Sequence, residues 1–282
     1  MEESIRKADI LIEALPYLQA FRGKVIVAKY GGSAIDHPTA MRGILQDLVF
    51  LSVVGLHHVL VHGGGPAITR KLSETGKKSL FIDGMRVTDE ETMQIVNREL
   101  EVVNHRLVSQ VQELGGHAEG LIPRHGVIVA KPHPRVAQLG CVGSVKTVQT
   151  EPIRKLFPHH AIPVISPVGR GDGRLYNINA DDVASDVAAH LKAEKLVLLT
   201  NVRGILRQAN DLESLISTLT TTEAKRLMER HVIQEGMIPK VMACVAALRR
   251  GVKKTHIIDA AIPHAMLLEI FTKQGIGTEI IR

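Results

Sequence analysis

Short apolar runs alternate with segments of helical periodicity along most of this 282-residue chain. The runs 25–29 and 59–62 are strand-like, and helix-like segments follow them over 39–54 and 67–75. Strands that are connected through helices in this way run parallel, and the connections are right-handed. We therefore expect an α/β fold, a three-layer α/β/α sandwich with a mainly parallel central sheet.

The middle of the chain interrupts this alternation. Between residues 121 and 148, short strand-like runs are separated by Gly and Pro, and a turn-rich segment follows at 169–173. This pattern predicts β-hairpins that project from the main sheet. We place a lobe boundary here, between an N-lobe over 24–172 and a C-lobe over 173–282. Helices are then expected up to 192, from 222 and over 240–250, with strands at 196–199, 255–258 and 278–281.

A long helix is predicted before that middle region. Thr88 is followed three residues later by Glu91, the pattern of a capping box at a helix start. The helical periodicity then continues to about Leu114, where Gly115 and Gly116 end it.

The first 23 residues predict a separate helix with one apolar stripe. Pro16 lies inside it and is expected to kink it. A helix that precedes the first strand cannot be a crossover, so its stripe packs either on its own body or on another subunit, and both alternatives stay open. The stripe consists of Ile5, Ala8, Ile12, Leu15 and Leu18.

Composition excludes several classes of protein. No apolar run approaches the ~20 residues of a membrane span, and the N-terminus lacks the pattern of a signal peptide, so we expect a cytoplasmic protein without membrane contact. The net charge is +6, but the cations are scattered and only 3% of residues are aromatic, which disfavours nucleic acid as a partner.

Histidine and cysteine give no metal site. The fourteen histidines form no HExxH pattern, and we assign no metal ligands. The pairs at 57–58 and 159–160 are expected at the surface or at strand edges. Cys141 and Cys244 lie far apart without a CxxC spacing and are expected to be reduced, buried thiols.

Two glycine-rich segments are candidates for phosphate binding. Lys29-Tyr30-Gly31-Gly32 ends the first strand-like run with a cation beside unshielded backbone N–H groups. The segment 61–66 places Gly63, Gly64 and Gly65 between a strand and a helix, where free N–H groups favour an anion. Ile68 stands where a dinucleotide-binding fingerprint requires a third small residue, which weakens that alternative.

Three more segments carry polar groups suited to a site. Arg86, just before the long helix, has a planar guanidinium that suits a carboxylate, although a surface salt bridge is the alternative. The segment 176–182 contains two Asn and two Asp at a helix start, more than capping requires. Lys240 ends the segment 236–240.

Taken in order, these five segments resemble the amino-acid kinase family, over about residues 25–278. The resemblance is to the members that phosphorylate the γ-carboxylate of N-acetyl-L-glutamate with ATP, the second step of arginine biosynthesis. It implies ATP with Mg²⁺, the ion being held mainly by the nucleotide phosphates. The motifs are Lys29-Tyr30-Gly31-Gly32, Val61-His62-Gly63-Gly64-Gly65-Pro66, Gly84-Met85-Arg86-Val87-Thr88-Asp89, Tyr176-Asn177-Ile178-Asn179-Ala180-Asp181 and Gly236-Met237-Ile238-Pro239-Lys240-Val241.

The resemblance implies a role for each candidate residue. It makes Lys29 and Lys240 the lysines that stabilise the transition state, and Asp181 the residue that orients both. Arg86 is implied to bind the α-carboxylate of acetylglutamate, and Asn177 its acetylamido end or neighbouring polar groups. Backbone donors to phosphate or substrate are implied at Gly31, Gly32, Gly64 and Gly65.

The ends of the chain resemble the arginine-inhibited members of the family, which carry an N-terminal kinked helix and form homohexamers as trimers of dimers. This likeness implies an inhibitory L-arginine site lined by Tyr17, Glu269 and Gly275. It also admits a PII-type nitrogen-signalling protein as a partner.

Some positions depart from the family pattern. Asn201 stands where Asp is usual, Glu235 where Gly is common, and 122–125 replaces a segment that usually carries Gly-Lys-Asp. Ala260 and Ala261 replace a common Gly-Arg beside the implied arginine site. Two alternatives stay open: a kinase for aspartate, glutamate or carbamate, and a catalytically silent arginine sensor.

Overall fold

The computed structural model describes residues 1–32, 35, 37–208, 211–234, 236–272 and 275–282. Its centre is a sheet of eight strands. The neighbouring strands pair in parallel except β13 and β14, which are antiparallel, so the expected mainly parallel sheet is confirmed. From edge to edge the strands are β12 (Thr218–Thr220), β14 (Thr278–Ile281), β13 (Lys254–Asp259), β11 (Lys195–Thr200), β1 (Val25–Tyr30), β2 (His57–His62), β8 (Ala161–Ile165) and β5 (His117–Leu121).

Hairpins from the middle of the chain form a second sheet, as the sequence predicts. Its strand order is β10 (Arg174–Asn177), β9 (Val168–Gly171), β6 (Ile128–Pro132) and β7 (Gly143–Val148). The lobe boundary placed after residue 172 falls in the turn between β9 and β10. Two short strands, β3 (Phe81–Ile82) and β4 (Met85–Arg86), form a separate hairpin before the long helix.

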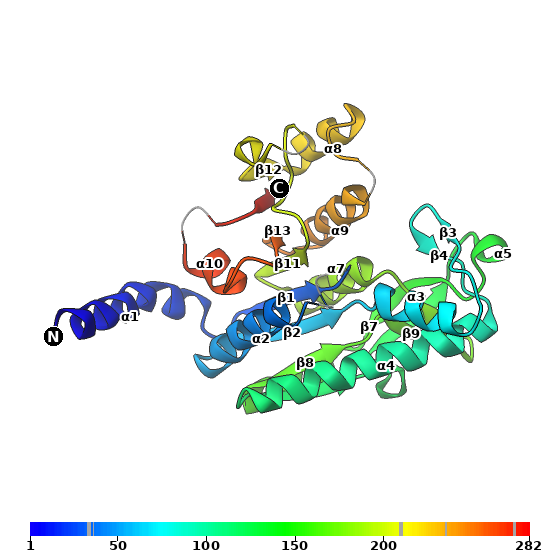
Figure 1. Cartoon of the computed structure of the whole chain (residues 1–282), viewed down its shortest axis with the longest axis horizontal. Coiled ribbons are helices and arrows are strands. Elements are labelled where there is room, and N and C mark those ends of the chain that lie inside the picture. Colours follow the sequence, from blue (N-terminus) through cyan, green and yellow to red (C-terminus); the bar gives the residue numbers. More distant parts are fainter. Residues whose placement is uncertain (33–34, 36, 209–210, 235, 273–274) are drawn as a thin grey trace.

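Helices cover both faces of the main sheet and complete the three layers (Figure 1). The face that carries Ile26 and Leu60 packs against α2, α4 and α10, while the opposite face, with Val27 and Val59, packs against α7, α9 and part of the second sheet. The helices are α1 (Glu2–Phe21), α2 (Pro38–Val53), α3 (Gly65–Glu74), α4 (Glu90–Glu113), α5 (Val136–Leu139), α6 (Glu151–Arg154), α7 (Ala180–Leu191), α8 (Thr221–Glu229), α9 (Met237–Arg249) and α10 (Ala265–Phe271), with short 3-10 turns η2 (Pro123–His125), η3 (Phe157–His159) and η4 (Leu212–Ser214).

The first helix, α1, reaches out from the body of the molecule (Figure 1). It continues through Pro16, and only its C-terminal part, with Phe21, packs on the core beside α2 and α10. Ile5, Ile12 and Leu15 of the predicted stripe are 53%, 67% and 44% exposed. Within one subunit, the stripe therefore does not pack on its own body.

The start of α4 differs from the sequence prediction. The residue that caps the helix is Asp89, whose carboxylate accepts the Thr92 N–H at 2.7 Å. Thr88 instead is fully buried and donates its hydroxyl to the Arg86 carbonyl. The capping box failed as a prediction because two adjacent residues can both cap, and only tertiary packing decides which one turns inward.

Two further expectations about side chains were wrong. His58 is a core residue, 1% exposed, because β2 is an interior strand with both neighbours paired. Cys244 is buried as expected, but Cys141 is only partly buried.

The turn expected at 169–173 is shorter in the structure. The strand β9 extends to Gly171, so that Asp172 and Gly173, both at positive φ, make the turn.

The topology brings three strand ends together. β2, β1 and β11 are adjacent and parallel, so their carboxyl ends lie at one edge. Lys29 lies near the end of β1, and His62 ends β2 just before the triple glycine. In open α/β sheets ligands bind outside this edge, which is where the candidate site lies.

Candidate active site

Asp181 joins the two lysines that the sequence singled out. Its Oδ1 lies 2.9 Å from the Lys29 Nζ, and its Oδ2 lies 3.1 Å from the Lys240 Nζ. The three residues come from β1 and from the first turns of α7 and α9. Lys29 and Asp181 are buried, while the Lys240 side chain keeps about a quarter of its surface exposed.

The carboxylate of Asp181 is held ionised. Burial opposes its charge, but the two lysine charges outweigh burial, and the pKa of Asp181 is lowered from its ordinary value. Asn179 caps α7 by accepting the Asp181 N–H at 2.8 Å, which fixes where the helix, and with it the carboxylate, begins. Each lysine keeps donors for another anion, because an ammonium group has three.

The two glycine loops touch each other above the strand ends. The Gly63 N–H donates to the Tyr30 carbonyl at 2.7 Å. A Cβ on Gly31 would lie 2.9 Å from the Lys29 Nζ and 3.2 Å from the Gly63 Cα, so no side chain fits between the loops. Gly32 has a φ of +67°, a conformation that glycine adopts without strain.

Arg86 is positioned by several neighbours. Its guanidinium donates to the Ser79 and Thr69 hydroxyls at 2.5 and 2.7 Å and to the Gly65 carbonyl at 3.2 Å, and it stacks 4.7 Å from the centroid of the Phe81 ring. Burial lowers the pKa of Arg86, but an arginine stays charged at neutral pH. A buried cation whose position is fixed in this way is suited to a carboxylate ligand.

A cavity of about 450 Å³ brings most of these groups together. Asn177, whose amide donates to the Thr88 hydroxyl at 3.2 Å, also lines it. Two candidate residues, Lys240 and Gly31, are not among the residues that line this cavity, although Lys240 is paired with Asp181, which does line it. The other candidates that line it are Lys29, Gly32, Gly64, Gly65, Arg86 and Asp181.

Sequence reasoning missed the residues that hold Arg86. Thr69 and Ser79 lie in segments without a motif, and the only sequence signal was their closeness to the glycine loop and to Arg86. His133, in the connection after β6, and Ser144 of β7 also line the cavity and were not singled out.

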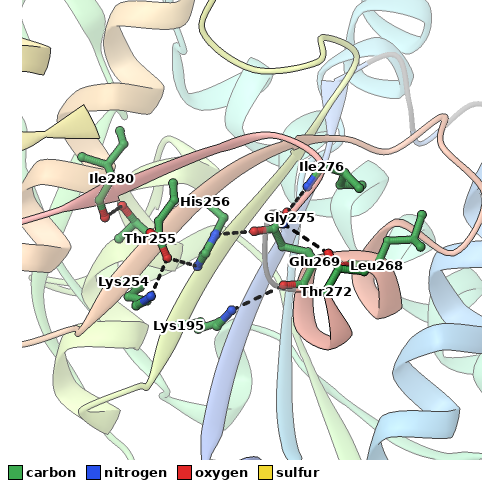
Figure 2. A network of polar contacts seen from close by, with 11 residues as sticks. Lys195, Lys254, Thr255, His256, Leu268, Glu269, Thr272, Gly275, Ile276 and Ile280 are labelled. Carbon is green, nitrogen blue, oxygen red and sulfur yellow. Dashed lines mark hydrogen bonds and ion pairs between the residues drawn. The ribbon is translucent and has the colours of Figure 1, made fainter. Parts of the chain in front are cut away.

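A second polar cluster surrounds Glu269 on α10 (Figure 2). Its Oε1 lies 2.5 Å from the His256 Nδ1, and its Oε2 accepts the Ile276 N–H at 2.9 Å. Lys195 approaches the Glu269 carbonyl at 3.5 Å. Burial raises the pKa of Glu269, but His256 and Lys195 lower it by more, so the carboxyl is held ionised.

The three residues expected at an arginine site lie near this cluster. Gly275 has a φ of +64°, and a Cβ there would lie 2.8 Å from the Glu269 Oε1. Tyr17 of α1 packs edge-on against Phe271 of α10, with 6.0 Å between ring centroids. Lys195 and His256 were missed by sequence reasoning; Lys195, a cation directly before the apolar run of β11, was the available signal for one of them.

The departures from the family pattern lie at different places. The segment 122–125, which includes η2, does not line the cavity. Asn201 is exposed at the end of β11, and Ala260 is buried while Ala261 is exposed. Glu235 lies outside the described residues.

Among the described residues, no three His, Cys, Asp or Glu side chains come together as a metal site. Within the same part of the chain, no helix is both long and apolar enough to cross a membrane.

This site and fold are those of a phosphoryl-transfer enzyme, and comparison with known proteins agrees. Residues 24–259 match the model of the amino acid kinase family. The chain belongs to this family.

Relatives that match the chain along its whole length are named acetylglutamate kinase. The one from Heliobacterium modesticaldum is 45% identical over 295 aligned positions and covers all of both chains. The one from Methanocaldococcus jannaschii is 46% identical, with 100% of this chain and 98% of the relative covered.

A solved structure is also similar: N-acetylglutamate synthase from Neisseria gonorrhoeae complexed with coenzyme A and N-acetyl-glutamate. It matches with a TM-score of 0.86 at 27% identity over 96% of this chain, and the chain spans 62% of the synthase. A second structure of that synthase is complexed with L-arginine and matches with a TM-score of 0.82 at 26% identity over 95% of this chain and 64% of the synthase.

Proposed function

We propose that this enzyme phosphorylates the γ-carboxylate of N-acetyl-L-glutamate with ATP and so takes part in arginine synthesis. The observation that carries the proposal is the ion-paired Lys29, Asp181 and Lys240 beside two glycine loops and Arg86. The names of the full-length relatives support this substrate.

The residues fit the reaction in distinct roles. An oxygen of the γ-carboxylate attacks the γ-phosphorus of ATP, and the bond from that phosphorus to the β–γ bridging oxygen breaks, which leaves ADP. The carboxylate is already ionised at pH 7, so no general base is needed. Lys29 and Lys240 neutralise charge on the phosphoryl oxygens while Asp181 holds the two cations in place. Gly31 and Gly32 offer backbone donors to phosphate, Gly64 and Gly65 to the substrate.

The substrate's ends are recognised by other groups. Arg86 binds its α-carboxylate as a bidentate partner, and Asn177 binds the acetylamido end. The N-lobe thus supplies most of the acceptor site, while the C-lobe supplies Lys240 and binds the nucleotide.

The donor set fits a magnesium ion that arrives with ATP. Asp181 is engaged by both lysines, and in the described part of the chain no three His, Cys, Asp or Glu side chains come together to hold a metal ion. The ion, held by the nucleotide phosphates, would help to neutralise their charge.

An assay of acyl-phosphate formation tests the proposal. The enzyme is incubated with ATP and one acceptor at a time, and hydroxylamine traps any acyl phosphate as a hydroxamate. We expect a product with N-acetyl-L-glutamate and none with aspartate, glutamate or carbamate. A product with another acceptor would assign the alternative kinase, and no product with any acceptor would favour a silent sensor.

We further propose that L-arginine inhibits the enzyme by binding at the Glu269 cluster, and that the protein is a homohexamer whose α1 helices join its dimers. The ionised Glu269 carboxylate is suited to the guanidinium of the ligand. Tyr17 brings α1 next to this cluster through Phe271. The cytoplasmic location and a PII-type partner stay predictions.

An arginine titration of the kinase reaction tests this second proposal. Glu269→Gln removes the negative charge and keeps the size, so we expect the arginine concentration for half-inhibition to rise at least about tenfold. Glu229→Gln is the matched control, since Glu229 pairs with Lys225 on the surface of α8, and it should leave the titration unchanged. Equal inhibition of Glu269→Gln and the wild type would show that Glu269 is not part of the arginine site.

A further inference from the structure

A buried chain of hydrogen bonds leads from α4 to the triple-glycine loop. Asn104, 1% exposed, places its Nδ2 2.8 Å from the Val164 carbonyl and 3.1 Å from the His62 Nε2. The His62 Nδ1 in turn lies 2.9 Å from the Gly63 carbonyl oxygen. His62 is fully buried, and neither side chain lines the cavity.

The partners of Asn104 determine the form of the imidazole. The Val164 carbonyl can only accept a hydrogen bond, so the amide atom beside it is the NH₂ group. That group can only donate, so the His62 Nε2 beside it must be an acceptor without a proton. The remaining proton is on Nδ1, where it donates to the Gly63 carbonyl. Asn104 thereby selects one neutral tautomer of His62.

This tautomer fixes the peptide plane between Gly63 and Gly64. The plane is trans, since the described chain has no cis peptide, and in a trans peptide the C=O and the following N–H point in opposite directions. The Gly63 carbonyl is held toward the buried ring of His62. The Gly64 N–H is consequently turned the other way, and Gly64 lines the cavity.

Close packing leaves the network little freedom to rearrange. A Cβ on Gly120 would lie 2.1 Å from the Asn104 Oδ1, and one on Gly64 would lie 2.6 Å from the Leu100 Cδ2. Gly63 is also held at its other end by its bond to Tyr30. Burial lowers the pKa of His62 to about 4, so the neutral ring persists at pH 7.

We infer that His62 is a positioning residue for phosphoryl transfer, and that Asn104 sets the tautomer with which it orients the Gly64 N–H toward the substrate. The inference rests on the proposed function, in which Gly64 is a backbone donor. It predicts that loss of the hydrogen-bond donor at position 62 lowers kcat more than it lowers the stability of the fold.

Two substitutions of His62 distinguish a role in orienting Gly64 from a role in packing alone. His62→Leu removes the donor to Gly63, and we expect kcat to fall by about 10- to 100-fold, the loss of one positioned hydrogen bond. His62→Asn retains an N–H near the place of Nδ1, and we expect it to recover kcat to within about fivefold of the wild type. His58→Leu, a buried histidine on the same face of the same strand, is the matched control and should leave kcat and KM unchanged.

A spectroscopic measurement makes the test independent of folding defects. In protein labelled with ¹⁵N-histidine, the His62 signals are those that disappear in His62→Asn. We expect a protonated Nδ1 and a bare Nε2 in the wild type at pH 7. Asn104→Asp places an oxygen acceptor beside Nε2, and we expect it to shift the proton toward Nε2.

Either of two results would overturn the inference: a protonated Nε2 in the wild type, or wild-type kcat in His62→Leu. Failure of the proposed function is distinguishable, because it shows in the wild-type enzyme as no acyl phosphate with N-acetyl-L-glutamate, while the tautomer is measured without turnover. If the wild type phosphorylates another acceptor, kcat of the wild type and of the variants is measured with that acceptor as the substrate.

Discussion

Asp181 divides one carboxylate between two lysines that lie far apart in the sequence. Each oxygen faces one ammonium group, so the spacing of the two cations is set by the width of a single carboxylate. In the proposed reaction, such a pair of cations would be preorganised around the moving phosphoryl group and would stabilise the transition state without rearrangement.

Substitution of either lysine should therefore remove most of the activity. We expect Lys29→Ala and Lys240→Ala each to lower kcat by roughly 100-fold or more, the usual cost of losing one preorganised charge contact. The measurement is steady-state kinetics with the hydroxamate assay. Lys155→Ala, which removes a surface partner of Glu151, serves as the control. Near-normal kcat in both variants would show that Lys29 and Lys240 do not stabilise the transition state.

His58 predicts how stability depends on pH. Burial lowers its pKa to about 3, from 6.5 in a solvated histidine, and neither ring nitrogen has a hydrogen-bond partner among the described residues. The unfolded chain therefore binds a proton that the folded chain does not, so stability rises with pH between about 3 and 6.5. From pH 7 to pH 5, His58 alone should lower the free energy of unfolding by about 2 kcal/mol.

Denaturant unfolding at pH 7 and at pH 5 checks this value. His58→Leu cannot bind the proton, so its loss of stability between the two pH values should be smaller than that of the wild type by about 2 kcal/mol. Equal losses in the two proteins would show that His58 does not contribute.

Sequence reasoning worked best for residues that lie in glycine-rich motifs. Lys29, Arg86 and Asp181 were found because the strand ends and helix starts that carry them were recognisable in the sequence. The structure places all three residues on one cavity. Thr69 and Ser79 could not be predicted in the same way, since their contacts with Arg86 depend on how a hairpin folds over α3. His58 was misjudged because a histidine pair at a strand start says nothing about which neighbours cover it.

At the scale of elements, the capping residue of α4 is open to measurement. Asp89→Ala removes the acceptor of the Thr92 N–H, and we expect about 1 kcal/mol lower stability, or a Tm lower by roughly 2 °C. Glu91→Ala also removes a partner of Lys77 but leaves the cap intact, and its effect should be smaller. A larger Tm loss for Glu91→Ala would assign the stabilisation to Lys77 rather than to the cap.

Element types were easier to predict than element ends. The strands β1, β2 and β11 follow directly from apolar runs, because interior parallel strands are buried on both faces. The pairing of β14 between β12 and β13 could not be read from these runs, since it requires an antiparallel neighbour in an otherwise parallel region. The strands β6 and β7 were predicted correctly, but the run that begins at Leu121 is the end of β5 in the main sheet, and the turn at 169–173 was placed too broadly.

At the scale of the whole molecule, most of α1 reaches beyond the body of the subunit, and only its C-terminal part packs on the core. Ile10, Leu11 and Ile12 are each more than half exposed, an apolar surface that pairing with another copy would cover. If the proposed hexamer forms through α1, we expect Leu11→Glu to convert it into dimers, because the substitution places a charge on this surface. Sedimentation velocity gives the mass of each species.

The control for this experiment keeps the helix and changes its polar side. Glu13→Gln, on the exposed surface of α1, should leave the hexamer intact. A hexameric Leu11→Glu variant, or a wild-type protein that sediments as a dimer, would contradict assembly through α1.

The position of β14 has a consequence for synthesis on the ribosome. It follows every other strand of the main sheet in the sequence, yet it lies between β12 and β13 and pairs with both. While the chain is being made, β13 presents an unpaired edge and β12 has no place in the sheet until β14 emerges. A nascent chain that stalls before Thr278 would thus display a bare, apolar strand edge of the kind that chaperones recognise and aggregates extend.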